Sequence, residues 1–241
     1  MSISKQTDSS VLEIRHKALL IADAHYPHHG NELVEILEKI KHAKIVTDQI
    51  FLMGDIFDLL FGHNRYIQSF SKKAIGLLEE LSTEIEIHYL EGNHDFCLDG
   101  IFPDMKVYGR SDQPIRAKLG RKSVMLSHGD IYDAGMLYGI YSFLLRNALT
   151  LNLLKPFQYT IIDDRMRKLK EKNICSDRTD MDTKIDKIVS HYPEDIDLII
   201  EGHFHRGVVT DRYMSLPSLA CQKSLAVVEN STVLFVPLEK L

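Results

Sequence analysis

Short apolar runs recur along the chain, and five of them end at a polar loop. The five runs cover residues 18–22, 50–53, 85–89, 124–126 and 197–200. Apolar runs of this length, bounded by glycine and polar residues, are typical of buried strands. Helices are predicted for three longer segments, residues 31–44, 66–81 and 177–191, the first two from apolar residues at helical spacing. The alternation of strands and helices predicts an α/β fold.

The polar residues that follow the five runs form one candidate metal site. These residues are Asp23, His25, Asp55, Asn93, His128, His203 and His205. Loops at the carboxyl ends of strands converge in an open α/β sheet, so we expect these side chains to lie together. Carboxylate, imidazole and amide groups without sulfur suit manganese, iron or zinc better than calcium. Asp55 is the candidate bridge between two ions about 3.5–4 Å apart, a spacing that suits phosphoryl transfer.

Composition and charge limit the classes of function. The 241 residues are enough for one domain with a sizeable core. The net charge of -5 argues against a general nucleic-acid binder. Cys97, Cys175 and Cys221 are odd in number and widely spaced, so we expect neither a disulfide framework nor a thiolate zinc site. A reducing cytoplasm fits best, and residues 1–16 show no secretory signal.

The loops contain five short motifs in a defined order. The motifs are Asp23-x-His25, Gly54-Asp55-x-x-Asp58, Gly92-Asn93-His94-Asp95, His128-Gly129 and Gly202-His203-x-His205. This ordered set resembles the signatures of the calcineurin-like metallophosphoesterases. The resemblance implies a β-sandwich flanked by helices, in a four-layer αββα arrangement, formed by residues 1–241 as a single domain. It also implies two divalent metal ions, the first bound by Asp23, His25, Asp55 and His205 and the second by Asp55, Asn93, His128 and His203.

Catalytic roles follow from this arrangement. A hydroxide held between the two ions would attack phosphorus in line, with its pKa lowered by the metals. His94 follows the ligand Asn93 and is the candidate to protonate the leaving oxygen or to stabilise phosphoryl charge. Asp95 is the candidate to orient His94. Taken singly, Asp58 and Asp95 are equally well interpreted as turn or helix caps. The remaining histidines with no strand-end position are interpreted as residues that do not bind metal: His28, His29, His63, His88 and His191.

A closer resemblance concerns the substrate. The segments Gly54 to Asp58, Asn93 to Phe96, Ser127 to Asp130 and Gly202 to Arg206 are similar to those of the UDP-2,3-diacylglucosamine hydrolases of lipid A biosynthesis. Those enzymes cleave a pyrophosphate to give UMP and a lipid phosphate. This chain departs from that family at His94, where the family usually has arginine, and in the segment that follows Asp130.

Three alternatives stand beside the lipid A hydrolase. One is another metallophosphoesterase that acts on a nucleotide, a phosphoprotein or another phosphodiester. A second is a binding scaffold that keeps the fold without turnover, which is disfavoured because no ligand position is lost. A third is a nuclease, which would need a basic groove with stacking aromatic residues.

Residues 136–172 carry no ligand loop and form a candidate helical insertion. An apolar first part is broken at Lys155-Pro156, and a basic second part contains Arg165, Arg167 and Lys168. A helix pair buried against the sandwich is the alternative, and polar interruptions argue against a membrane span. We expect a cap over the metal site that holds acyl chains, with Asn93, Arg165, Arg167 and Lys168 contacting the substrate. Such a cap also suits peripheral contact with the cytoplasmic face of the inner membrane.

Overall fold

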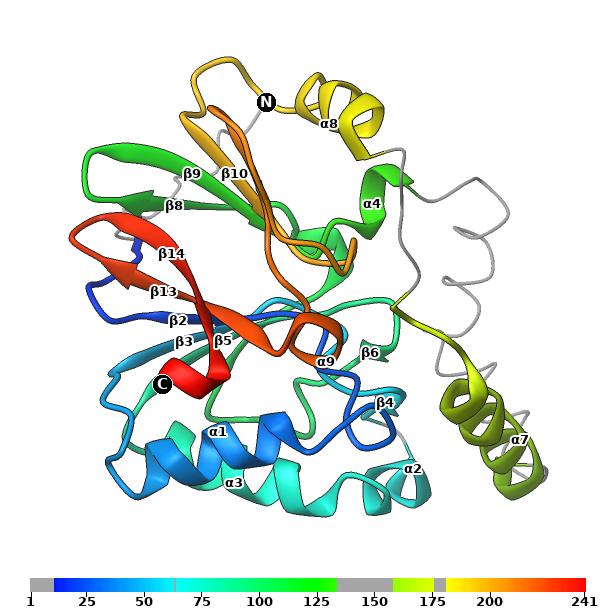
Figure 1. Ribbon diagram of the computed structural model, residues 1–241. Helices are drawn as coiled ribbons and strands as arrows, with labels where there is room; N and C mark the ends of the chain where they lie inside the picture. The colour runs from blue at the N-terminus through cyan, green and yellow to red at the C-terminus, as the bar shows by residue number, and fades with distance from the viewer. Residues whose placement is uncertain (1–10, 63, 134–157, 176–180) are drawn as a thin grey trace, which may run out of the picture.

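Two six-stranded sheets form the centre of the molecule (Figure 1). The computed structural model describes residues 11–62, 64–133, 158–175 and 181–241. The first sheet, called here the β3 sheet, has the order β14 (Thr232–Pro237), β13 (Ser224–Glu229), β2 (Leu19–Ile21), β3 (Gln49–Leu52), β5 (Glu86–Leu90) and β7 (Lys106–Tyr108). The second, called here the β9 sheet, has the order β1 (Leu12–Glu13), β8 (Ile115–Leu119), β9 (Lys122–Ser127), β10 (Leu198–Glu201), β12 (Tyr213–Ser215) and β11 (Val208–Val209).

Helices cover the outer face of each sheet. On the β3 sheet lie α1 (Glu32–Lys41) and α3 (Lys72–Ser82), and on the β9 sheet lies α8 (Met181–Val189) (Figure 1). The shorter elements are α2 (Arg65–Ser69), α4 (Asp130–Asp133), α9 (Leu219–Gln222), the 3-10 turns at Arg110–Asp112 and Leu238–Lys240, and the pair β4 (Leu60–Phe61) and β6 (Asp95–Phe96). The helix α7 (Gln158–Glu171) lies at one side of the molecule near α2.

Three apolar cores separate the layers. Alternate residues of β3 point to opposite faces: Ile50 packs with α1 and α3, whereas Phe51 packs between the sheets. On the other side, Ile200 of β10 joins the core between the sheets and Ile199 packs against α8. The four layers therefore confirm the predicted αββα sandwich.

Parallel pairing brings the ligand loops to one end of each sheet. In the β3 sheet, β2, β3 and β5 are parallel, with Leu20 opposite Phe51 and Phe51 opposite His88. In the β9 sheet, β9 and β10 are parallel, with Leu126 opposite Ile200. Because parallel strands present their carboxyl ends at the same edge, the loops after these five strands meet there.

Two sequence-based predictions were wrong. The single helix expected over residues 66–81 is divided into α2 and α3, with Ser71 buried at the break. Ser69 Oγ donates to Tyr66 O at 2.6 Å, a local bond that competes with continued helix. The three cysteines were expected to form no disulfide framework, yet Cys175 and Cys221 are bonded across 46 residues of sequence.

The insertion is described only in its second part. Residues 134–157, which include the apolar half of the predicted cap, lie outside the described residues. The basic half is α7, which begins at Gln158, after Pro156. None of the described helices has the length and apolar character needed to cross a membrane. The single-domain and cap assignments stay predictions.

Candidate metal centre

Most of the candidate ligands have an unusual backbone conformation. Positive φ angles occur at Asp23 (50°), His25 (45°), Asp55 (51°), His203 (68°) and His205 (54°). The left-handed region costs a non-glycine residue about 1–3 kcal/mol, and such strain is concentrated at functional sites. The sharp turns after the strands therefore direct these side chains to one place. A backbone that continued in the extended conformation would not bring them together.

Two glycines allow the loops to approach one another. A Cβ atom on Gly92 would lie 2.3 Å from Asp55 Oδ1 and 2.4 Å from Asp55 N. A Cβ atom on Gly54, whose φ is 84°, would lie 2.3 Å from His128 Nδ1. Only glycine fits at either position, so the close packing of the ligand loops requires glycine at 54 and 92.

The first group of candidate ligands consists of Asp23, His25 and His205. The Nε2 atoms of His25 and His205 are 3.1 Å apart, and His205 Nε2 lies 3.4 Å from Asp23 Oδ1. Ligand atoms bound to one ion at about 2.1 Å lie about 3 Å from each other, so these spacings fit a metal ion. Burial lowers the pKa of His25 to about 3, which keeps the imidazole neutral and able to bind a cation.

The second group consists of Asp55, His128 and His203, with Asn93 beside it. His128 Nε2 lies 3.2 Å from Asn93 Oδ1 and 3.6 Å from Asp55 Oδ2. His128 and Asp55 are buried, and His203 is half-buried. All seven predicted ligands are thus brought into two neighbouring groups, and the bridging role of Asp55 stays a prediction.

The outer nitrogens of the histidines fix the direction of their rings. His128 Nδ1 donates to Met53 O at 3.0 Å, and His205 Nδ1 donates to Ile174 O at 2.8 Å. Such bonds leave Nε2 as the inward atom, the arrangement of outer contacts that metal-binding histidines usually have. Asp23 Oδ1 is buried and accepts no hydrogen bond among the described residues. A buried carboxylate oxygen facing two imidazole nitrogens indicates a place for a cation.

His94 is held beside this centre by two bonds. Its backbone N–H donates to Asp55 Oδ1 at 2.8 Å, and its Nδ1 donates to Asp58 O at 2.7 Å. The His94 ring centroid is 5.2 Å from that of His25. Since Nδ1 is engaged, Nε2 is the ring atom that can exchange a proton with a substrate.

The hydrogen bonds of Asp95 among the described residues do not include one to His94, the residue that Asp95 was expected to orient. Its carboxylate accepts from the backbone N–H groups of Gly92 (2.8 Å), Asp55 (3.0 Å) and Ile56 (2.7 Å), and from Tyr89 Oη (2.7 Å). Asp95 is fully buried and joins the loops after β3 and β5. This carboxylate therefore holds together the two loops that carry Asp55 and Asn93. The catalytic assignment of Asp95 stays a prediction.

Asp58 has a larger role than a turn cap. Its side chain is buried and accepts from the backbone N–H and Nδ1 of His28, both at 2.9 Å. Asp58 Oδ1 lies 3.7 Å from His25 Nδ1 and 3.5 Å from His29 Nε2. His28 and His29 therefore surround the carboxylate behind a candidate ligand. Their adjacency to the Asp23-x-His25 motif was the only signal in the sequence.

A buried glutamate supports the loops of the β9 sheet, and the sequence analysis missed it. Glu201 Oε1 accepts from Ser127 Oγ at 2.9 Å and Tyr192 Oη at 2.5 Å, and Oε2 accepts from Tyr213 Oη at 3.0 Å. Burial raises the pKa of Glu201. Ser127 and Glu201 directly precede His128 and Gly202, so this network ties the ends of β9 and β10 together.

The helix α7 is joined to the region next to the centre. Asn64 Nδ2 donates to Gln158 Oε1 at 2.8 Å, Tyr66 Oη donates to Asp163 Oδ1 at 2.6 Å, and His29 Nε2 donates to Leu169 O at 3.1 Å. These contacts position a helix beside the histidines that surround Asp58.

The predicted substrate-binding residues of α7 are exposed. Arg167 and Lys168 form ion pairs with Asp164, both at 2.6 Å, and Arg165 faces solvent. The described structure does not bring these three side chains into the metal groups. Their contact with substrate stays a prediction.

Known proteins resemble this chain at several levels. The family model of the calcineurin-like phosphoesterases matches residues 16–207. A UDP-2,3-diacylglucosamine hydrolase from Chromohalobacter salexigens is 27% identical over 207 residues, covering 79% of this chain and 80% of the relative. Another from Porphyromonas gingivalis is 32% identical over 127 residues, covering 48% of this chain and 47% of the relative. A phosphoesterase structure from E. coli has a TM-score of 0.47 at 13% identity, covering 93% of this chain and 95% of that one.

Proposed function

The chain belongs to the calcineurin-like phosphoesterases, a family of metal-dependent hydrolases with a dinuclear metal centre, and on this basis we propose that it hydrolyses the pyrophosphate of UDP-2,3-diacylglucosamine. The products would be UMP and the lipid monosaccharide phosphate. The observation that carries the proposal is the pair of facing ligand groups, Asp23, His25 and His205 beside Asp55, His128 and His203, with His94 next to them.

Each residue of the centre would have its own role in a phosphoryl displacement. When bound, two divalent ions would activate water and neutralise charge on the phosphoryl oxygens. Manganese is our first expectation, with iron or zinc as alternatives. Asn93, whose Oδ1 lies 3.2 Å from His128 Nε2, would contact both an ion and a phosphoryl oxygen. His94 Nε2 would donate to the leaving oxygen, and Asp58 O would hold the ring in the orientation that this requires.

The substrate class is supported by the relatives and by α7. The two relatives named above are called UDP-2,3-diacylglucosamine hydrolases. On α7, Tyr159 and Ile161 are 57% and 44% exposed, and Arg165, Arg167 and Lys168 lie on the exposed surface of the same helix. Apolar and basic side chains on one helix suit a substrate with acyl chains and a diphosphate. They also suit contact with an anionic membrane face from the cytoplasm.

The decisive experiment measures product from two substrates. Manganese-loaded protein is incubated with UDP-2,3-diacylglucosamine in detergent, and UMP is quantified by chromatography; a small soluble phosphodiester is assayed in parallel. We expect UMP release from the lipid substrate and none from the variant Asp55→Ala. In Arg165→Ala we expect KM for the lipid substrate to rise while hydrolysis of the soluble ester is unchanged.

The outcomes separate the proposal from its alternative. Turnover of the soluble phosphodiester without UMP release would favour another metallophosphoesterase, a result that His94 in place of the usual arginine would help to explain. Absence of turnover on both substrates, with two ions bound, would contradict the phosphoesterase assignment itself.

A further inference from the structure

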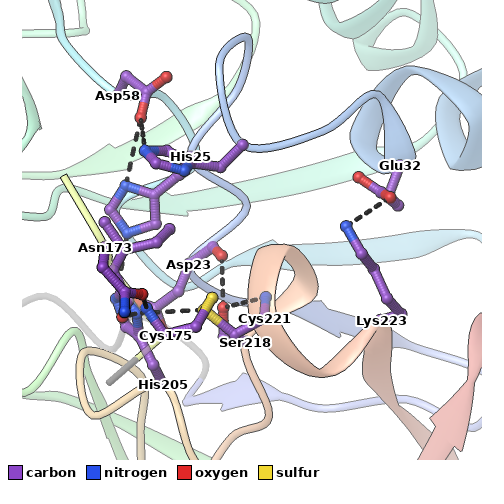
Figure 2. Close-up of a disulfide and its surroundings, with 12 residues drawn as sticks. Asp23, His25, Glu32, Asp58, Asn173, Cys175, His205, Ser218, Cys221 and Lys223 are labelled. Carbon is purple, nitrogen blue, oxygen red and sulfur yellow. Dashed lines mark hydrogen bonds and ion pairs between the residues drawn. A yellow bond between two sulfur atoms is a disulfide. The ribbon is translucent and has the colours of Figure 1, made fainter. Parts of the chain in front are cut away.

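A disulfide lies at the wall of the candidate metal centre. Cys175 follows the last turn of α7, and Cys221 lies in α9, with their Cα atoms 5.3 Å apart. Figure 2 shows the two sulfur atoms beside His205 and close to Asp23. Cys221 Sγ is 3.7 Å from His205 Nδ1. The bond therefore contacts a residue of the first ligand group directly.

The segment that the disulfide restrains also holds His205. Ile174, the residue before Cys175, is buried, and its carbonyl accepts the bond from His205 Nδ1 at 2.8 Å. This bond directs His205 Nε2 toward Asp23 and His25. Residues 172–175 have no helical or strand structure of their own, so the disulfide is a covalent restraint on the position of this carbonyl.

The other end of the disulfide is anchored to the same centre. Ser218 Oγ accepts from Cys221 N at 3.1 Å and donates to Asp23 O at 2.9 Å (Figure 2). The backbone N–H groups of Leu219 and Ala220 donate to Ala22 O and Asp23 O at 2.9 and 3.1 Å. The helix α9 is thus fixed on the Asp23 loop, and the disulfide connects this fixed point to the carbonyl that orients His205.

We propose that Cys175 and Cys221 form a reversible thiol oxidation site that controls metal binding at Asp23, His25 and His205. In the oxidised protein the disulfide keeps the Ile174 carbonyl on His205. In the reduced protein residues 172–175 are released, His205 loses its outer partner, and the first ion is held more weakly. The group of Asp55, Asn93, His128 and His203 would hold the other ion, and we expect it to keep that ion on reduction.

The reductant is a dithiol. One thiolate of the dithiol attacks Sγ of Cys175, an exposed residue, whereas Cys221 is half-buried. The bond between Cys175 and Cys221 breaks, a mixed disulfide forms at Cys175, and Cys221 leaves with a proton as a thiol. The second thiol of the dithiol then attacks the mixed disulfide, which releases the Cys175 thiol and the oxidised dithiol. Two electrons and two protons pass from the dithiol to the protein.

The test measures metal and thiols, independently of turnover. Chelator-stripped protein is divided into an oxidised sample and a sample treated with a dithiol, and each is titrated with manganese alone. Thiols counted after denaturation should rise from one, Cys97, to three on reduction. We expect two manganese sites in the oxidised protein, and in the reduced protein one of the two should have a Kd about 10-fold or more higher, the usual effect of losing an outer partner of a metal-binding histidine.

Two variants serve as controls. Cys175→Ser should show the weaker site whether or not the dithiol is present, whereas Cys97→Ser should respond to the dithiol as the unmodified protein does. Equal manganese affinities in the oxidised and reduced samples would overturn the proposal while leaving the metal centre intact. Three free thiols that no oxidant converts to a disulfide would also overturn it. The inference rests on the metal centre of the proposed function, so a protein that binds neither manganese, iron nor zinc in either state would contradict both.

Discussion

The buried carboxylate of Asp95 allows a prediction with a worked magnitude. It accepts bonds from three backbone N–H groups and from Tyr89 Oη at 2.7–3.0 Å, and a longer bond from the backbone N–H of Phe57 at 3.4 Å. A buried donor left without a partner costs about 1–3 kcal/mol. In Asp95→Ala five donors lose their partner, one of them only weakly bonded, and a water molecule can restore some of them, so we expect a loss of about 4–6 kcal/mol in the free energy of unfolding. The free energy of unfolding of a folded domain is typically about 5–15 kcal/mol, so the expected loss is roughly half of a mid-range value.

Two further variants give an ordered series. Asp95→Asn keeps one acceptor oxygen but turns an NH₂ group toward the other donors, so we expect a loss of about 2–3 kcal/mol. Tyr89→Phe removes one donor and leaves the backbone bonds in place, with an expected loss of about 1 kcal/mol. The order of destabilisation should therefore be Tyr89→Phe, Asp95→Asn, Asp95→Ala.

The assay is urea unfolding of the chelator-treated protein. The chain contains no tryptophan, so far-ultraviolet circular dichroism is the signal. Equal m-values are needed for the free energies to be compared. A loss below about 1 kcal/mol in Asp95→Ala, or equal losses in Asp95→Asn and Asp95→Ala, would refute the bracing role. If Asp95 instead takes part in proton transfer, the metal-loaded Asp95→Asn protein will show an altered pH profile of kcat at nearly unchanged stability.

Three other predictions concern the metal centre and the β3 sheet. Asp55→Ala should lose activity by at least about 10³-fold and should release one or both ions. Metal analysis and a turnover assay on the same samples measure this. Full activity with unchanged metal content would show that Asp55 does not bridge two ions. His94→Ala should lower kcat by about 10²–10⁴-fold at nearly intact metal content. Activity retained in His94→Arg would favour charge stabilisation over proton transfer. Loss of metal in His94→Ala would make His94 a ligand. Burial lowers the pKa of His88 to about 4, whereas the unfolded chain has the usual value near 6.5, so the unfolded state binds the extra proton between these pH values. The stabilising contribution of neutral His88 is complete above pH about 6.5 and is lost as the pH falls to about 4. Over that range the free energy of unfolding of the chelated protein, measured with urea, should fall by about 2 kcal/mol more than that of His88→Phe. A parallel pH dependence of the two proteins would contradict this.

The strands and the ligand loops could be predicted because their signals are local. An apolar run of four or five residues that ends at glycine and aspartate is visible without any knowledge of packing, and β3 with Asp55 is an example. The grouping of the ligands then follows from the parallel order of the strands. The two six-stranded sheets confirm the predicted strands, and the metal-binding roles of the loops stay predictions.

The features that were missed depend on contacts between distant residues. Cys175 and Cys221 are 46 residues apart, and their pairing requires residues 172–175, which follow α7, to lie beside α9. The partners of Asp95 could not be predicted either, because a carboxylate that accepts backbone N–H groups from other loops has no sequence pattern. For Asp58 the only signal was the position of His28 and His29 next to the Asp23-x-His25 motif. The break between α2 and α3 was hidden by apolar residues that continue at helical spacing through it.

Each candidate ion takes ligands from both sheets of the sandwich. Asp23 and His25 follow β2 in the β3 sheet, whereas His205 follows β10 in the β9 sheet. Asp55 and Asn93 follow β3 and β5, whereas His128 and His203 follow β9 and β10. Bound metal would therefore cross-link two sheets that are also joined by apolar packing and by hydrogen bonds such as the one from His128 Nδ1 to Met53 O. Chelation should speed amide hydrogen exchange at the carboxyl ends of the strands in both sheets together, while the amino ends of the same strands keep their protection.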